Sequence, residues 1–255
     1  MARMTLGVIF GNRDFFPDHL VTEARNDIRS LFAELEINGI MLDESATKLG
    51  GVETWSDSKR CADLFRRHAA EIEGILVCLP NFGDEKGVAD TVKLSGLDVP
   101  ILVQAYPDNL HQFMVERRRD AFCGKVSVCN NLRQYGYAYT LTDRHTVHPS
   151  SPSFRQDLVS FLGVCRVVNG LRKARLGAVG ARPGAFNTVR YSEKLLQASG
   201  MTVTTLDLSE VLGWVTRLPD EDGAVAKKLA DIKAYADYGS VPPPSLVKMA
   251  KLGVV

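Results

Sequence analysis

The chain has 255 residues, of which 45% are apolar and 24% charged, an ordinary composition for one large or two modest globular domains. A formal net charge of +1 excludes the broad basic field that would hold nucleic acid or an anionic membrane surface, so we expect neither as a partner. No run approaches the ~20 consecutive apolar residues of a membrane helix. The first apolar run, Leu6–Phe10, is too short for a signal peptide.

Short runs rich in Val, Ile and Leu recur in the N-terminal part of the chain. They are apolar on consecutive residues, which predicts strands buried on both faces near 5–10, 39–43, 74–79 and 100–105. The amphipathic stretches between them predict helices over 18–38, 53–71 and 84–95. This alternation predicts a doubly wound α/β domain with a parallel sheet, Rossmann-like or flavodoxin-like.

Residues 106–150 are less regular. Arg117–Asp120 is interpreted as part of a solvated helix, and the alternating Tyr135–Tyr139 as an edge strand or hairpin. Apolar residues on one face predict a long helix over 154–171. We place a domain boundary within this helix, so that residues 1–165 form the first domain and residues 166–255 begin a second.

A second α/β pattern starts near Ala174. Strands are predicted at 176–180 and 201–206, and helices at 187–199, from 209 onward, at 220–238 and at 242–252. Two strands rarely form a stable sheet alone, and Lys251–Val255 resembles the approach to a third strand. The second domain is therefore expected to be incomplete. The alternative is a complete C-terminal part that docks on the first sheet.

The five cysteines indicate the redox compartment. They are Cys61, Cys78, Cys123, Cys129 and Cys165, an odd number without a CxxC pair. This usage is typical of reduced thiols in a cytoplasmic protein rather than of a disulfide framework.

Polar side chains follow three of the predicted strands. Asn12 and Arg13 come after the first strand, Asn81 comes after the third, and Gln104–Pro107 lies at the end of the fourth. Ligands of open α/β sheets bind at the carboxyl ends of the strands, and amide and guanidinium groups suit hydroxyl or anionic ligands. These residues predict a polar ligand cleft. The alternative is ordinary turn and capping chemistry, since Asn, Pro and Gly are common in turns and Asp18 precedes a helix.

Two further segments concentrate hydrogen-bonding side chains. From Asn130–Gly136 we take Asn131, Arg133 and Tyr135 as candidate ligand contacts, with a solvated turn as the alternative. His145 and His148 are three residues apart, but Thr146, Val147 and Pro149 favour extended structure, which separates them. We therefore expect an interfacial or substrate-contacting histidine there rather than a metal site.

The segment Gly177–Gly184 invites a nicotinamide-binding interpretation. Its glycine spacing departs from the dinucleotide fingerprint, and Pro183 interrupts it. Asp207, at the end of the next predicted strand, does stand where a dinucleotide site has its ribose-binding acid. The sequence contains no phosphate-binding P-loop, no G-x-S-x-G and no H-E-x-x-H. The residues alone thus predict an α/β protein with a polar ligand cleft and no assigned catalytic group.

Several segments together resemble the L-fucose/L-arabinose isomerase family, in a branch described as fucose/arabinose isomerase-like. The likeness covers nearly the whole chain and rests on Gly11–Pro17, Leu79–Gly87, Arg118–Gly124, Val128–Gly136 and Gly180–Arg190. The resemblance implies two α/β domains followed by a mainly β domain. It also implies oligomers in which first-domain residues reach a neighbour's active site, so the Arg13 loop and the 130–135 segment would contact the sugar. We therefore expect Arg13, Asn81, Asn131 and Arg133 to gather at the carboxyl edge of the first sheet, partly exposed around a common hollow. Asn131 and Arg133 are placed there by the resemblance alone.

The resemblance implies an aldose–ketose isomerase, an intramolecular oxidoreductase acting on a sugar. A divalent metal, typically Mn²⁺, would polarise the C1 and C2 oxygens while a carboxylate moves a proton through an enediol. Its ligands would lie beyond Val255, so no residue here is assigned a catalytic or metal-binding role, and the segment alone is expected to be inactive. The alternatives are a non-catalytic sugar-binding or regulatory module and, third, an oxidoreductase.

Overall fold

The computed structural model describes residues 3–109, 111–112 and 114–255, and the chain divides into two compact units, 1–170 and 171–255. The boundary predicted from the sequence, between residues 165 and 166, falls inside helix α5 (Pro152–Arg172). Among the described helices, none is both long and apolar enough to cross a membrane.

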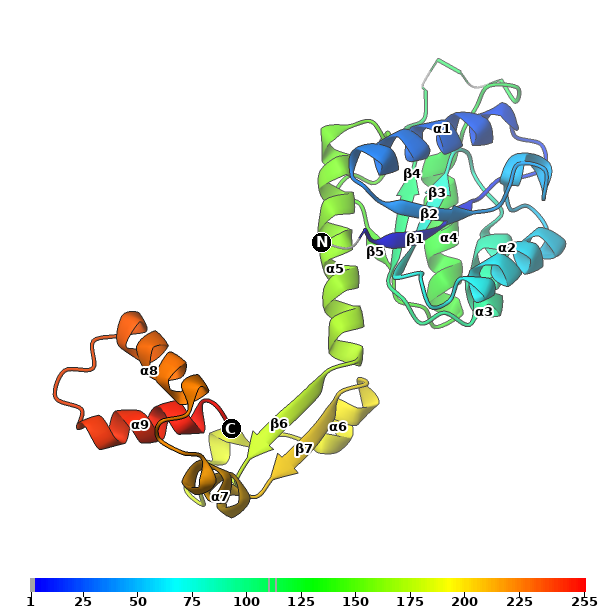
Figure 1. Cartoon of the computed structure of the whole chain (residues 1–255). Helices are drawn as coiled ribbons and strands as arrows, with labels where there is room; N and C mark the ends of the chain where they lie inside the picture. Colours follow the sequence, from blue (N-terminus) through cyan, green and yellow to red (C-terminus); the bar gives the residue numbers. More distant parts are fainter. Residues whose placement is uncertain (1–2, 110, 113) are drawn as a thin grey trace. The chain divides into compact units, whose positions relative to one another are not determined.

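Unit 1 is built on a five-stranded parallel sheet (Figure 1). Its strands are β1 (Thr5–Phe10), β2 (Asn38–Met41), β3 (Gly74–Leu79), β4 (Ile101–Ala105) and β5 (Thr140–Leu141). Every pairing is parallel and the order is β2-β1-β3-β4-β5, which confirms the predicted doubly wound fold and matches the flavodoxin-like order. The edge strand lies at β5, just after the Tyr135–Tyr139 segment in which it was expected.

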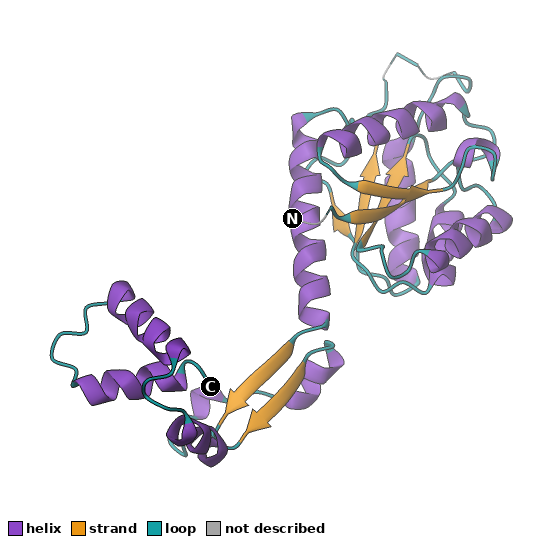
Figure 2. Cartoon of the chain, in the orientation of Figure 1, coloured by secondary structure: helices purple, strands orange, loops and turns teal. Residues whose placement is uncertain are grey.

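Helices cover both faces of this sheet (Figure 2). The helices α1 (His19–Glu34) and α5 pack on one face, and α2 (Trp55–Arg67), α3 (Glu85–Ser95) and α4 (Ala121–Gln134) pack on the other. Leu76 and Cys78 of β3 face α1 and α5, whereas Ile75 and Val77 face the opposite core. Because side chains alternate along a strand, burial of both faces requires the continuous apolar runs seen in the sequence.

One predicted helix is wrong and one helix was not predicted. Arg117 lies in a turn and Arg118–Asp120 is irregular, so the helix expected over 117–120 is absent, and α4 begins at Ala121. Asp120 has a φ of 54°, a left-handed conformation that interrupts a helical path at this point. The carboxylate of Asp108 instead accepts hydrogen bonds from the first amides of α4, from Ala121 N at 2.9 Å and Phe122 N at 3.1 Å.

Unit 2 contains a parallel pair, β6 (Arg175–Val179) and β7 (Thr202–Leu206), as predicted. Its helices are α6 (Glu193–Ala198), α7 (Leu208–Arg217), α8 (Gly223–Tyr235) and α9 (Pro243–Leu252), and short 3₁₀ turns occur at Asn187–Val189 here and at Lys48–Gly50 in unit 1. The helix expected over 187–199 is thus shorter. Lys251 and Leu252 end α9, and a turn follows, which corrects the expected approach to a strand.

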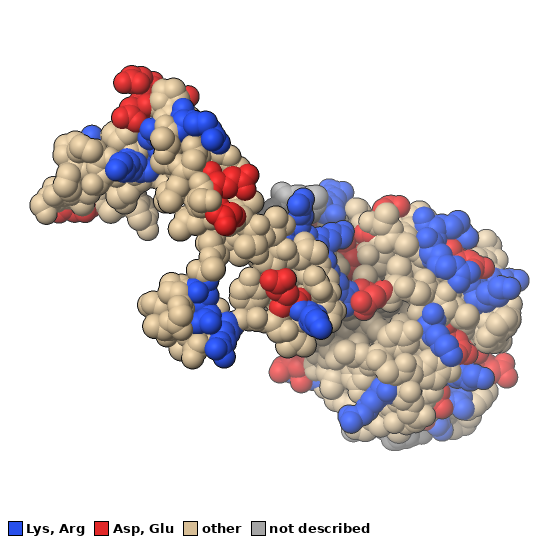
Figure 3. Space-filling model, turned by 90° about the horizontal axis from the view of Figure 1, so that it is seen from below, with Lys and Arg blue, Asp and Glu red and all other residues tan. Residues whose placement is uncertain are grey.

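Charges of both signs are interspersed over the face of unit 1 seen in Figure 3. This distribution agrees with the formal net charge of +1.

Candidate functional site

The carboxyl ends of β1 and β3 are joined by two buried amides. Asn12 and Asn81 are both fully buried, and the Asn81 side-chain amide donates a hydrogen bond to Asn12 Oδ1. Asn12 in turn donates to Glu53 and, at 3.0 Å, to Asp18 Oδ1. The predicted partial exposure of Asn81 toward a hollow is therefore wrong. The Asn81 oxygen accepts a hydrogen bond from Gly83 N at 3.0 Å. Both amides are therefore hydrogen-bonded within the chain at the point where the strand order reverses, where ligands of such sheets usually bind.

Charged groups surround this amide pair and complete a polar clasp, which we define as Asn12, Asp18, Lys48, Glu53 and Asn81. Lys48 Nζ lies 2.8 Å from Asp18 Oδ2 and 3.9 Å from Glu53 Oε1. Burial raises the pKa of Glu53, while Lys48 and the Asn12 amide oppose that shift. The hydrogen bond to Asp18 raises the pKa of Lys48. The polar clasp ties the loop after β1 to the loops before α2 and after β3.

Arg13 lies on the loop that the polar clasp holds, and its side chain is partly exposed. Its guanidinium lies over the Phe82 ring, 4.6 Å from the centroid. Phe82 stacks with Phe16 at 6.1 Å, and Arg118 lies over Phe16 at 5.4 Å. Three strand-end loops thus meet in an arginine–phenylalanine stack, defined as Arg13, Phe82, Phe16 and Arg118. Stacking on a ring face leaves the in-plane N–H donors of a guanidinium available to a ligand.

Asn131, Arg133 and Tyr135 are not brought to this edge. They lie at the end of α4, which connects two parallel strands and so runs from the carboxyl edge back across the sheet, about 20 Å for its 14 residues. Asn131 donates to Ser127 O within the helix at 3.3 Å, and the Tyr135 hydroxyl donates to Asp90 at 2.9 Å. The expected gathering of Asn131 and Arg133 with Arg13 is wrong, because that segment is the end of a helix rather than a strand-end loop. Their role in substrate contact stays a prediction.

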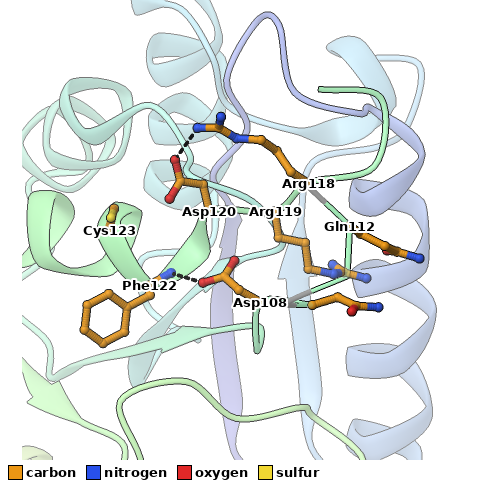
Figure 4. Close-up of a pocket in the computed structure, with 8 residues that line it drawn as sticks. Asp108, Gln112, Arg118, Arg119, Asp120, Phe122 and Cys123 are labelled. Atoms are coloured by element: carbon orange, nitrogen blue, oxygen red, sulfur yellow. Dashed lines mark hydrogen bonds and ion pairs between the residues drawn. The ribbon is translucent and has the colours of Figure 1, made fainter. Parts of the chain in front are cut away.

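A groove lies beside the segment that follows β4, where the sequence placed one polar strand end, although Arg118, Phe122 and His148 were not expected to line it. It consists of two adjoining hollows of about 430 and 520 Å³ that share Asp108, Asn109, Gln112 and Arg119. The smaller hollow is drawn in Figure 4, where Arg118, Phe122 and Cys123 also line it. The larger hollow is also lined by Tyr106 and His148. Segments from three parts of the chain form these walls, which is why no local motif revealed them.

Asp27 of α1 organises the wall of the larger hollow. The Tyr106 hydroxyl donates to Asp27 Oδ2 at 2.7 Å, and His148 Nε2 lies 3.4 Å from the same oxygen. Ser150 N donates to His148 Nδ1 at 3.2 Å, which assigns the proton of the neutral imidazole to Nε2, facing Asp27. Burial raises the pKa of Tyr106, so its hydroxyl stays protonated and acts as a donor. His148 thus lines a hollow, whereas the His145 ring packs against Phe122.

A comparison with known protein families shows to which family this chain is related. A family described as fucose/sulfoquinovose isomerase, N-terminal domain, matches residues 7–172, which covers nearly all of unit 1. The chain belongs to this family.

Two curated relatives of the fucose/sulfoquinovose isomerase family are similar over a shorter stretch. They are sulfoquinovose isomerases from Priestia aryabhattai and from Priestia megaterium (strain ATCC 12872 / QMB1551), each 26% identical over 106 residues. The match covers 41% of this chain and 23% of each relative, so this chain spans about a quarter of their length. These findings confirm the resemblance to sugar isomerases, and the sugar in the relatives' names is neither L-fucose nor L-arabinose.

The divalent metal that this family resemblance implies does not fit the residues in hand. Within the described ranges, no group of three or more His, Cys, Asp or Glu side chains is arranged to hold a metal ion. The carboxylates that line the groove are already engaged, Asp108 with the amides of α4 and Asp120 with Arg118. We therefore derive no metal-dependent step from these residues.

The nicotinamide interpretation of Gly177–Gly184 also lacks its structural context. Gly180 turns the chain after β6 with a φ of 74°, but the next α-helix begins only at Glu193. A dinucleotide fingerprint needs a helix N-terminus directly behind the glycine turn to bind the pyrophosphate. Asp207 accepts a hydrogen bond from Ser209 N at 2.7 Å and caps α7. Its carboxylate thus has a local structural role.

Proposed function

We propose that the protein to which this chain belongs is an aldose–ketose isomerase, in which unit 1 contacts the sugar rather than carrying out the chemistry. The match of residues 7–172 to the fucose/sulfoquinovose isomerase family carries the proposal. An aldose–ketose exchange is an internal redox step, since hydrogen moves between C1 and C2 of one molecule. It needs no external oxidant, in keeping with the missing context for a nicotinamide site.

The contact that we assign first is Arg13. The arginine–phenylalanine stack presents its guanidinium at the carboxyl edge, and the polar clasp holds its loop in place. A divalent cation, with Mn²⁺ as the first candidate, would be held by residues outside those described here. We expect a homo-oligomer in which this edge faces the sugar bound by a neighbouring copy. L-fucose, L-arabinose and sulfoquinovose are the substrates to test.

A second candidate function is a non-catalytic sugar-binding or regulatory module. The absence of a metal-holding group among the described residues agrees with this module as well as with the isomerase. An assay of aldose–ketose interconversion by the complete protein distinguishes the two functions.

The test uses the complete protein with Arg13→Ala, assayed with each of the three sugars and added Mn²⁺. A hydrogen bond to a charged group contributes about 1.5–3 kcal/mol, so kcat/KM should fall about 10- to 100-fold. Arg67→Ala, which removes an exposed arginine from the last turn of α2, is the matched control and should leave kcat/KM unchanged. Wild-type protein that isomerises none of the sugars would contradict the isomerase. An active Arg13→Ala enzyme with unchanged kcat/KM would contradict the role of Arg13.

A further inference from the structure

We propose that the groove between β4 and α4, lined by Gln112, Arg118, Arg119 and Phe122, is a carbohydrate-binding surface that takes a neutral, hydroxyl-bearing face of a sugar. The choice of ligand rests on the proposed function, whereas the place and the preference for a neutral group come from the groove itself.

The groove combines hydrogen-bond donors with an exposed aromatic ring. Arg118 and Arg119 each carry five N–H donors, and only some of these form hydrogen bonds to residues that the structure describes. Gln112 adds an amide that can both donate and accept. Phe122 is 49% exposed at the start of α4 and presents an apolar surface to the C–H groups of a sugar. An apolar wall with a few orienting polar groups is the usual composition of a small-molecule site.

The charges around the groove are balanced within the chain, which disfavours an anionic ligand. Arg118 pairs with Asp120 at 2.6 Å, and Arg119 pairs with Glu23 at 2.9 Å. The helix N-terminus of α4, which attracts anions in other proteins, is occupied by the Asp108 carboxylate. A sulfate or phosphate would have to displace one of these carboxylates, whereas a hydroxyl group needs only the spare N–H donors.

The walls of the groove are held in place before any ligand binds. Arg119 Nη1 donates to Pro80 O at 2.9 Å, and its guanidinium lies 4.7 Å from the centroid of the Tyr106 ring. The His145 ring lies 4.2 Å from that of Phe122 and fixes its orientation. Figure 4 shows Arg118 paired with Asp120 and the amide of Phe122 bonded to Asp108. Preorganised side chains lose little conformational freedom on binding, so even a small ligand retains most of the interaction energy.

The groove is continuous with the edge that carries Arg13. Arg118 belongs both to the groove and to the arginine–phenylalanine stack, whose other end is Arg13. A sugar that occupies the groove therefore lies along the same carboxyl edge as Arg13. Asn12 and Asn81 are fully buried at the ends of β1 and β3, whereas the groove lies at the end of β4.

Saturation-transfer NMR on the 255-residue chain tests the proposal with L-fucose, L-arabinose and sulfoquinovose as probes and inorganic sulfate as competitor. We expect transfer to at least one of the sugars, without displacement by an equal concentration of sulfate. Phe122→Ala should weaken that binding about 3- to 10-fold, the range for loss of an aromatic contact. Tyr235→Ala removes a 93% exposed ring from α8 and should leave binding unchanged.

Three results would overturn the proposal: no transfer to any sugar, displacement by sulfate, or equal binding by the Phe122→Ala and Tyr235→Ala chains. If circular dichroism shows that Phe122→Ala is unfolded, Gln112→Ala provides a second variant, and it should weaken the binding of the same sugar.

Assays of the complete protein separate this inference from the proposed function. Sugar binding lost in Phe122→Ala, in a protein without isomerase activity, would contradict only the isomerase. Unchanged KM and kcat of a Phe122→Ala isomerase would contradict only the groove.

Discussion

Two basic side chains of unit 1 are fully buried, and both support loops at the edge of the sheet. Arg25 of α1 lies 3.5 Å from Glu44 and over the Phe10 ring, and burial, reinforced by nearby Arg29, lowers its pKa. Lys125 of α4 donates to Thr142 Oγ1 at 2.6 Å and to the carbonyl of His145 at 2.8 Å. Both acceptors of Lys125 are uncharged, so the protonated amine lacks a hydrogen-bonded carboxylate and its charged form is destabilised by burial.

This burial predicts a pH dependence that belongs to Lys125. Burial lowers its pKa to about 8 in the folded protein, whereas an unfolded lysine titrates near 10.4. Between these values the unfolded state binds more protons, so the lysine contribution to stability rises with pH, by at most about 3 kcal/mol. Lys125→Met lacks this contribution. The difference in unfolding free energy, variant minus wild type, should therefore fall between pH 8 and pH 10.5 in urea denaturation, and a constant difference would contradict the lowered pKa.

Among the elements, α4 departs most from what the sequence suggested. Ala121, Gly124, Val128 and Leu132 are buried at helical spacing, a signal that was available in the sequence. The glycine and the two asparagines in this stretch favour turns locally, and tertiary packing overrides that preference. Gly124 lies against the loop after β3, where a Cβ atom would overlap the carbonyl oxygen of Phe82. The close approach of α4 to this loop therefore requires glycine.

Gly124→Ala should consequently destabilise unit 1. The added methyl group meets backbone rather than a flexible side chain, so α4 must move, at a cost of about 1–3 kcal/mol. Gly163→Ala is the control, because Gly163 is also helical but has nothing within 4 Å of the added atom. That substitution should stabilise α5 by about 0.5–1 kcal/mol through helix propensity. Urea denaturation of both variants measures the contrast, and equal effects would show that α4 does not pack tightly on the Phe82 loop.

The two units differ in how completely their sheets are buried. Every residue of β3 is buried between two layers of helices, whereas four of the five residues of β6 are exposed. The buried apolar side chains of unit 2, all of whose residues the structure describes, are Val211, Val225, Leu246 and Ala250. Burial of apolar surface provides most of the free energy that resists local opening, so the two units should differ in local stability.

We predict that amide hydrogen exchange separates the units. The amides of β1, β3 and β4 should exchange last, and those of β6 and β7 should exchange well before them, because a two-stranded sheet with exposed faces opens without unfolding a large core. Mass spectrometry of peptides from the exchanged protein makes the comparison within one sample. Equal protection of β3 and β6 would indicate that unit 2 buries its sheet in solution.

The sequence by itself determined most elements of the fold, α4 excepted, as well as the family and the position of Arg13 after β1. Strand and helix periodicity reflect which side chains of a short segment are buried, so both could be recognised in the sequence without the structure. Only the tertiary structure decided which polar residues share a site. Asn12 and Asn81 are buried because partners within the chain satisfy their amides. Asn131 lies near the end of α4 that is far from the sheet edge carrying Arg13. Arg118, Phe122 and His148 line one groove through contacts between distant segments, and such contacts follow from packing, which no local pattern encodes.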